Sequence, residues 1–165
     1  MKKSLVSVLF LFFGLSIISG FAEDIKYDMN FTKETTCSIR NIPVYKNPAW
    51  VSKIDFKNGK SAFFCSPKSM FEFYFNDIKW ELFEVKNLID FQNIIVTDYK
   101  TLSPIDATKA FYVYGSNKIS AAGDDLVAFQ LKEDAQRYLE NNHGRRIFTF
   151  DEVKKSLIAL LNGRT

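Results

Sequence analysis

Apolar and polar positions follow one another along this chain in an order that predicts two similar halves. Between about 37 and 98 the pattern reads as alternating strand, turn, alternating strand, helix and apolar strand. The same order recurs between about 108 and 150, and placing Phe64 over Phe129 brings Phe73 over Tyr138. The pattern therefore predicts an α+β fold in which two ββαβ units pack side by side.

The first half carries sharp local signals. A strand that ends at Phe56 is followed by Asn58-Gly59, a pair typical of a tight hairpin turn, and 61–65 forms the returning strand. Ser66 is placed to cap the next helix, with Pro67 in its first position, where the missing amide proton costs nothing. We expect a helix to begin there.

Phe73 does not lie on the apolar face of that predicted helix, which is formed by Met70, Phe71, Tyr74 and Phe75. Two interpretations are open. An exposed Phe73 would mark a surface that binds a partner. Alternatively, the segment around Trp80 packs over the helix and buries Phe73 without any partner.

The second half predicts strands at 110–114, 126–129 and 146–150 and a helix at 132–141. A final amphipathic helix is expected at about 151–162. Thr149 and Glu152 have the spacing of a capping box at its start.

Residues 1–22 have the form of a secretory signal, with Lys2 and Lys3, an apolar run and a small residue, Ala22, at the expected cleavage point. No cysteine follows the apolar run, so no lipoprotein site is expected. Residues 23–165 would then form a single domain outside the cytoplasm, with no membrane insertion after cleavage. For a bacterial chain this compartment is the periplasm.

Charge and motifs exclude several functional classes. Loss of Lys2 and Lys3 leaves 20 basic and 19 acidic residues, so nothing attracts nucleic acid or an anionic membrane. No glycine-rich phosphate loop, zinc-ligand spacing or calcium loop is present in the sequence. With a single histidine, no Ser-His-Asp grouping can be assigned from the sequence. A dithiol redox enzyme is disfavoured, because Arg40 stands where a Cys-x-x-Cys motif would need its second cysteine. The sequence therefore predicts a protein that is not an enzyme.

Sulfur and imidazole donors are few after the signal: Cys37, Cys65, Met29, Met70 and His143. In an oxidising compartment Cys37 and Cys65 are candidates for a disulfide, and two reduced thiols would suit a soft metal such as Cu(I). Separate free thiols are the third possibility.

Four other features have structural explanations that compete with functional ones. Arg40 either lowers the pKa of Cys37 or is a solvated charge. His143 is more simply a cation at the end of a helix, with Gly144 in the left-handed position after the last turn. Asp124-Asp125 fits a turn, and Glu133-Asp134 fits the first turn of a helix.

Several segments resemble the NosL family of nitrous oxide reductase accessory proteins. They are AFYVYGS at 110–116, the Phe129-x-x-x-x-Asp134-Ala135 pattern, 94–99 and 105–107. The resemblance implies the paired ββαβ architecture. It also implies a periplasmic accessory protein that binds Cu(I) and passes it to a periplasmic or membrane-bound copper enzyme or its assembly machinery.

The family's ligand motifs are altered in this chain. Cys-x-x-Cys-Gly-Met corresponds to Cys37-Ser38-Ile39-Arg40-Asn41-Ile42, and Gly-Pro-Met-Gly corresponds to Ser120-Ala121-Ala122-Gly123. We therefore expect Cu(I) at Cys37, together with Cys65. The alternative is a metal-free interaction module on the same scaffold, with a Cys37–Cys65 disulfide.

Overall fold

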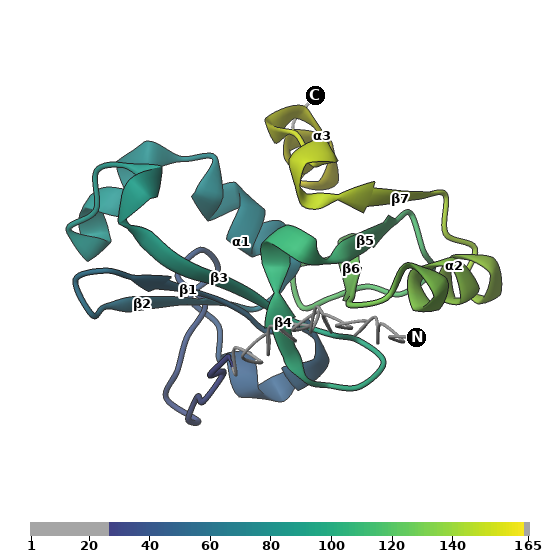
Figure 1. Cartoon of the computed structure of the whole chain (residues 1–165), viewed down its shortest axis with the longest axis horizontal. Coiled ribbons are helices and arrows are strands. Elements are labelled where there is room, and N and C mark those ends of the chain that lie inside the picture. The colour runs from purple at the N-terminus through teal and green to yellow at the C-terminus, as the bar shows by residue number, and fades with distance from the viewer. Residues whose placement is uncertain (1–26, 164–165) are drawn as a thin grey trace, which may run out of the picture.

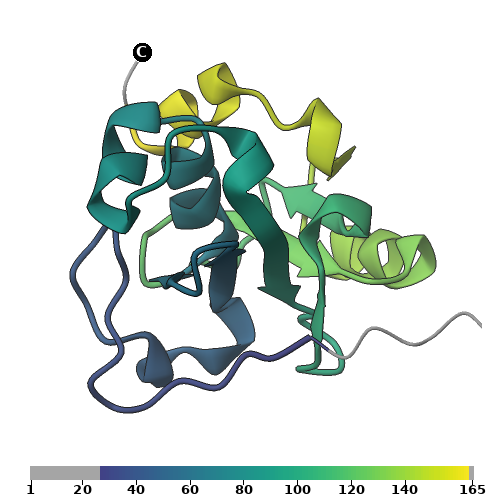
Figure 2. The ribbon, with the colours of Figure 1, turned by 60° about the vertical axis from the view of Figure 1, so that its left-hand side comes forward.

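The computed structural model describes residues 27–163 and contains two antiparallel sheets, each with its own helix. The first sheet has the order β2-β1-β3-β4 and the second the order β6-β5-β7, so the first strand of each unit is central. Figure 1 shows the two sheets side by side, and Figure 2 shows α2 on the outer side of the second sheet. The expected α+β class and its two packed ββαβ units are confirmed. The expected signal at 1–22 lies outside the described residues.

The first unit contains β1 (Ser52–Phe56), β2 (Ser61–Phe64), α1 (Pro67–Tyr74), β3 (Phe91–Thr97) and β4 (Pro104–Asp106). The second contains β5 (Phe111–Tyr114), β6 (Leu126–Phe129), α2 (Lys132–Asn141) and β7 (Arg146–Thr149), and α3 (Lys155–Leu161) follows. Short 3-10 turns occupy Val44–Lys46, Pro48–Trp50, Asp77–Phe83, Leu88–Asp90, Ala107–Lys109 and Phe150–Glu152. None of the helices in the described part is long and apolar enough to cross a membrane.

The signals at the start of α1 act as expected. Gly59 has φ +84° in the hairpin turn between β1 and β2, a conformation that glycine adopts without steric cost. The Ser66 side chain accepts a hydrogen bond from the backbone N–H of Ser69, and Pro67 is the first helical residue. This cap fixes the point at which the chain leaves β2 for α1.

Helix α1 is buried on two sides because it lies between the two units. Phe73 packs with Phe56 and Phe64 of the first sheet, at ring-centroid distances of 6.2 and 5.3 Å. Phe71 packs instead with Tyr112 of the second sheet, at 5.2 Å. Phe73 is fully buried, and the Trp80 indole N–H donates to its carbonyl at 2.8 Å. The interpretation of Phe73 as an exposed partner surface is therefore wrong, and burial beneath the Trp80 segment is correct.

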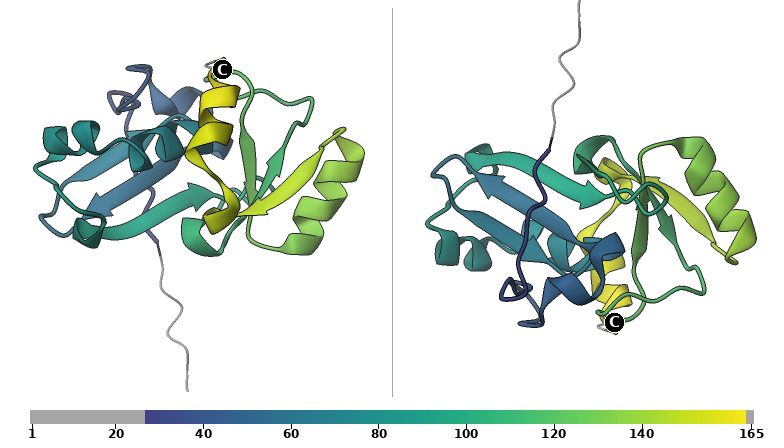
Figure 3. Two further views of the ribbon diagram at one scale, coloured as in Figure 1. Left: turned by 90° about the horizontal axis from the view of Figure 1, so that it is seen from above. Right: turned by 90° about the horizontal axis from the view of Figure 1, so that it is seen from below.

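Three details at other element ends differ from expectation. His143, not Gly144, takes the left-handed conformation after α2, with φ +58°. Gly144 is needed for a different reason, since a Cβ there would lie 2.9 Å from both Leu139 Cα and Val113 Cγ1. The Thr149–Glu152 capping box is present but caps the 3-10 turn before α3, not α3 itself. Helix α3 then lies over the junction of the two units (Figure 3).

Candidate metal centre

Cys37 and Cys65 come together although they are far apart in the sequence. Cys65 follows β2 directly and precedes the cap of α1, whereas Cys37 begins a loop that runs beside β2, where the Ser38 N–H donates to the Phe63 carbonyl at 2.8 Å. The two side chains interact closely enough that hydrogen bonding between them is the main cause that shifts the pKa of each, and both residues are 1% exposed. Both thiols are free. The structure thus joins the two sulfur atoms into one buried pair.

The loop after Cys37 folds tightly around its sulfur. The Asn41 N–H donates to the Cys37 carbonyl and the Cys37 N–H donates to the Ile42 carbonyl, each at 2.8 Å. Asn41 has φ +54°, in the left-handed region that only glycine and asparagine visit readily, and it stands where the family motif has glycine. Asparagine therefore supports a left-handed turn at this position.

Hydrogen bonds make the two thiols unequal. Donation from the Cys65 side chain is the main cause that lowers the pKa of Cys37 to about 6, against the opposing effect of burial. Backbone N–H groups of Cys65, Ile39 and Arg40 also donate to the Cys37 sulfur and favour its thiolate. The same hydrogen bond to Cys37, with burial, raises the pKa of Cys65. The pair therefore holds one negative charge and one shared proton at neutral pH.

This inequality predicts a pH profile for thiolate formation. We expect the ultraviolet absorbance of thiolate to rise as pH increases through about 6, because the pKa of Cys37 is lowered to that value from the ordinary thiol pKa of 9.0. In Cys65→Ser the rise should stay below the ordinary value, since a hydroxyl can still donate to Cys37. Cys37→Ser should remove the step near pH 6 altogether. A single step near the ordinary value in the native protein would contradict the arrangement.

Ser69 holds the second sulfur from the side of α1. The Cys65 Sγ and Ser69 Oγ atoms are 3.6 Å apart, and the Ser66 hydroxyl donates to Ser69 Oγ at 3.2 Å. All three residues are buried. The cap of α1 therefore also fixes the orientation of Cys65 toward Cys37.

The Arg40 side chain acts differently from either expectation. Its guanidinium pairs with Glu72 of α1 at 2.7 Å and also donates to the Asn162 side chain at 2.7 Å. Asn162 is the residue that ends α3, and its amide donates to Glu72 at 3.0 Å. The guanidinium is thus not a solvated charge. The contribution of Arg40 to the pKa of Cys37 comes through its backbone N–H.

Lys68 occupies the region of the second altered motif. Its ammonium donates to the carbonyls of Ala122 at 2.7 Å and Leu161 at 3.1 Å, and the residue is 1% exposed. Burial is the main cause that lowers the pKa of Lys68. The Asp125 carboxylate accepts from the backbone N–H of Lys68 at 2.8 Å and from the Ser120 hydroxyl at 2.6 Å. A buried cation with carbonyl partners therefore occupies this position.

Lys68, Glu72 and Asn162 were missed from the sequence, although a signal for two of them was present. Lys68 and Glu72 are charged residues within a helix whose apolar side chains point in two directions. A charge on such a helix must find a buried partner. Asn162 could not be found, because nothing local brings the end of α3 to Arg40.

The structure brings two cysteine sulfurs together as candidate donors. Within residues 27–163 no cluster of three His, Cys, Asp or Glu side chains is placed to hold a metal ion. His143 is exposed at the end of α2, on the second unit, and takes no part. Structural zinc requires about four ligands, whereas thiolates alone suit soft ions such as Cu(I). Two thiolates therefore fit a soft ion of low coordination number.

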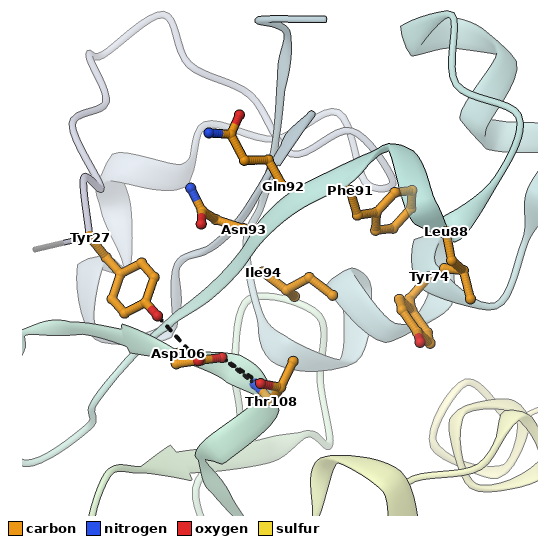
Figure 4. A pocket seen from close by; sticks show the side chains of 9 residues that line it. All are labelled: Tyr27, Tyr74, Leu88, Phe91, Gln92, Asn93, Ile94, Asp106 and Thr108. Carbon is orange, nitrogen blue, oxygen red and sulfur yellow. Dashed lines mark hydrogen bonds between the residues drawn. The ribbon is translucent and has the colours of Figure 1, made fainter. Parts of the chain in front are cut away.

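Other predicted acidic features are structural. Asp125 is buried by the bonds described above, and Asp134 pairs with Lys100 and Arg137. A separate cavity of about 380 Å³ lies beside β3 and β4, away from either cysteine (Figure 4). In it, the Tyr27 hydroxyl donates to Asp106 at 3.1 Å. Neither the acidic residues nor the cavity adds a soft donor to the Cys37–Cys65 pair.

Comparison with known proteins gives concordant results. A family model described as NosL matches residues 28–158. The copper-binding lipoprotein NosL of Stutzerimonas stutzeri is 39% identical over 54 residues, which are 33% of this chain and 28% of that relative's length.

A solved structure shares the fold. The crystal structure of the copper chaperone NosL from Shewanella denitrificans aligns with a TM-score of 0.67 over 79% of this chain and 98% of that one. The identity is 21%, so this likeness concerns the fold alone. Because the family model covers well over half of the sequence, the chain belongs to the NosL family.

Proposed function

We propose that this chain is a Cu(I)-binding accessory protein that holds the ion between Cys37 and Cys65 and delivers it to a copper enzyme or to that enzyme's assembly machinery. The observation that carries the proposal is the buried, hydrogen-bonded sulfur pair. Copper is here a cargo, and the chain catalyses no reaction of its own. The names of two similar proteins, a copper-binding lipoprotein and a copper chaperone, support the choice of metal.

The charge of the pair favours a monovalent ion. Before binding, one thiolate and one thiol carry a single negative charge between them. When Cu(I) binds both sulfurs, the shared proton leaves, so one unit of positive charge replaces another. The net charge of the buried site stays the same, and no new charge has to be desolvated. A divalent ion would raise the net charge of the buried site by one unit. It would also find only two ligands there.

Anaerobic titration tests the proposal. Reduced protein is titrated with Cu(I) in competition with a chromophoric chelator, and we expect one ion bound per chain. Protein in which both thiols have been alkylated after unfolding and then refolded serves as a control. Failure of the reduced, folded protein to take Cu(I) from the chelator would reject copper binding.

The periplasm is the compartment we propose. The signal-like residues 1–22 and the word lipoprotein in the name of one relative support an extracytoplasmic location. A cell fractionation with mass measurement of the mature chain tests it. We expect a periplasmic chain that begins after Ala22, and a cytoplasmic chain retaining residues 1–22 would contradict it.

The closeness of the two sulfurs also favours a second candidate. In an oxidising compartment the same pair can form a disulfide, which would leave a metal-free interaction module on this scaffold. A thiol count on protein isolated from its own compartment separates the two. A quantitative Cys37–Cys65 bond supports the second candidate, and two free thiols support the first.

A further inference from the structure

The sulfur pair is closed off from solvent, and this raises the question of how an ion would reach it. Cys37 and Cys65 are each 1% exposed. An ion passes between proteins by ligand exchange, in which a donor atom of one protein bonds to Cu(I) as a cysteine sulfur of the other dissociates. No electron is transferred, but the incoming donor must touch the metal. Some covering segment therefore has to move.

The cover over Cys37 is the loop 38–42. The loop folds back on Cys37, because the Asn41 N–H donates to the Cys37 carbonyl and the Cys37 N–H donates to the Ile42 carbonyl, each at 2.8 Å. Ser38 is tied to β2 through its backbone N–H, which fixes the start of the loop. The middle of the loop is fastened by the Arg40 side chain. Release of Arg40 would therefore remove the contacts of the loop with α1 and α3, and the two backbone bonds between Cys37 and residues 41–42 would be left to hold it.

Arg40 joins three elements through one guanidinium. It pairs with Glu72 on α1 and donates to Asn162 at the end of α3, while Asn162 also donates to Glu72. The Arg40 side chain is 26% exposed, so water and salt reach this contact. Its Nε atom is buried without a hydrogen-bond partner among the described residues. The Arg40 guanidinium thus holds the loop to α1 and α3 with one of its nitrogen atoms unpaired within the described part of the chain.

We infer that the Arg40–Glu72–Asn162 clasp is a gate, whose opening lifts the loop 38–42 and the end of α3 and exposes the sulfur pair for metal exchange. The inference rests on the proposed function. Arg40 is a positioning residue in this account and binds no metal. Because an ion pair is screened by salt, opening should become more frequent as ionic strength rises.

Alkylation of the reduced, metal-free protein measures this opening directly. Labelling by iodoacetamide is followed by mass spectrometry on the plateau of the pH profile, where the fraction of Cys37 thiolate is constant. For Arg40→Gln, which loses hydrogen bonds to charged groups, we expect labelling about tenfold faster than in the native protein. Asn162→Ala, which keeps the ion pair, should give a smaller increase in the same direction.

Salt and a matched variant separate gating from general loosening. Native labelling should accelerate with added salt, whereas labelling of Arg40→Gln should not. Lys60→Gln removes another cation, whose 2.8 Å pair with Glu84 lies at the hairpin tip, and should label at the native rate. Unchanged rates in both Arg40→Gln and Asn162→Ala would overturn the gate. Because labelling needs no copper, this result is independent of whether the protein binds Cu(I).

Discussion

Cys65→Ser is expected to lower the Cu(I) affinity by at least about a hundredfold, because loss of a residue that merely supports a ligand already costs about 10–100-fold. The variant removes one of the two cysteine sulfurs of the proposed site and replaces it with a smaller hydroxyl group. Ser69 can still hold the new hydroxyl, as it now holds the Cys65 sulfur at 3.6 Å. The lost affinity therefore reports the metal ligand and not a collapse of the helix cap.

Competition titrations of Cys65→Ser and Cys37→Ser measure the Cu(I) affinity. Each single substitution should be enough to lower it. His143→Asn is the matched control, since it removes the single imidazole of the chain and asparagine tolerates the left-handed conformation at φ +58°. Its affinity should equal that of the native protein. Native affinity in Cys65→Ser would show that Cys65 is not a ligand.

Phe73→Ala is expected to lower the free energy of unfolding by about 3–5 kcal/mol, the usual range for loss of a fully buried aromatic ring. Phe73 has no exposed surface, and its ring contacts Phe64 at 5.3 Å and Phe83 at 5.6 Å. The surrounding rings come from separate elements, so they cannot easily collapse into the space. Urea denaturation followed by far-ultraviolet circular dichroism provides the value.

Leu82→Ala is the control for Phe73→Ala. Leu82 belongs to the same 3-10 segment as Phe83 but is 73% exposed, so its truncation should change the free energy of unfolding by less than about 0.5 kcal/mol. If Phe73→Ala destabilised the protein no more than Leu82→Ala does, the burial of Phe73 between the first sheet and the Trp80 segment would be wrong.

The repeated strand and helix order could be predicted because local signals mark it. Asn58-Gly59 fixes the hairpin, and Ser66-Pro67 fixes the start of α1. The strand β4 was missed, since three residues that begin with Pro104 carry too little pattern. The burial of Phe73 was left open, because whether a helix is covered on one side or two depends on how the two units pack.

The candidate site was predictable only in part. The sequence named Cys37 and Cys65 as donors, and the structure brings the two together. A lowered pKa of Cys37 was one of the two interpretations of Arg40, but its main cause, hydrogen bonding to the Cys65 side chain, could not be foreseen because it depends on how the loop packs beside β2. Partners of Arg40 and Lys68 also lie far away in sequence, at the end of α3 and in the turn around Ala122.

X-ray absorption at the copper edge identifies the donor atoms in the protein with one bound Cu(I). Two sulfur ligands are expected, in the low coordination number that a pair of thiolates gives a soft ion. The native spectrum should survive in His143→Asn and be lost in Cys37→Ser. A nitrogen ligand, or a spectrum unchanged by the loss of Cys37, would contradict the assignment of the Cys37–Cys65 pair as the metal site.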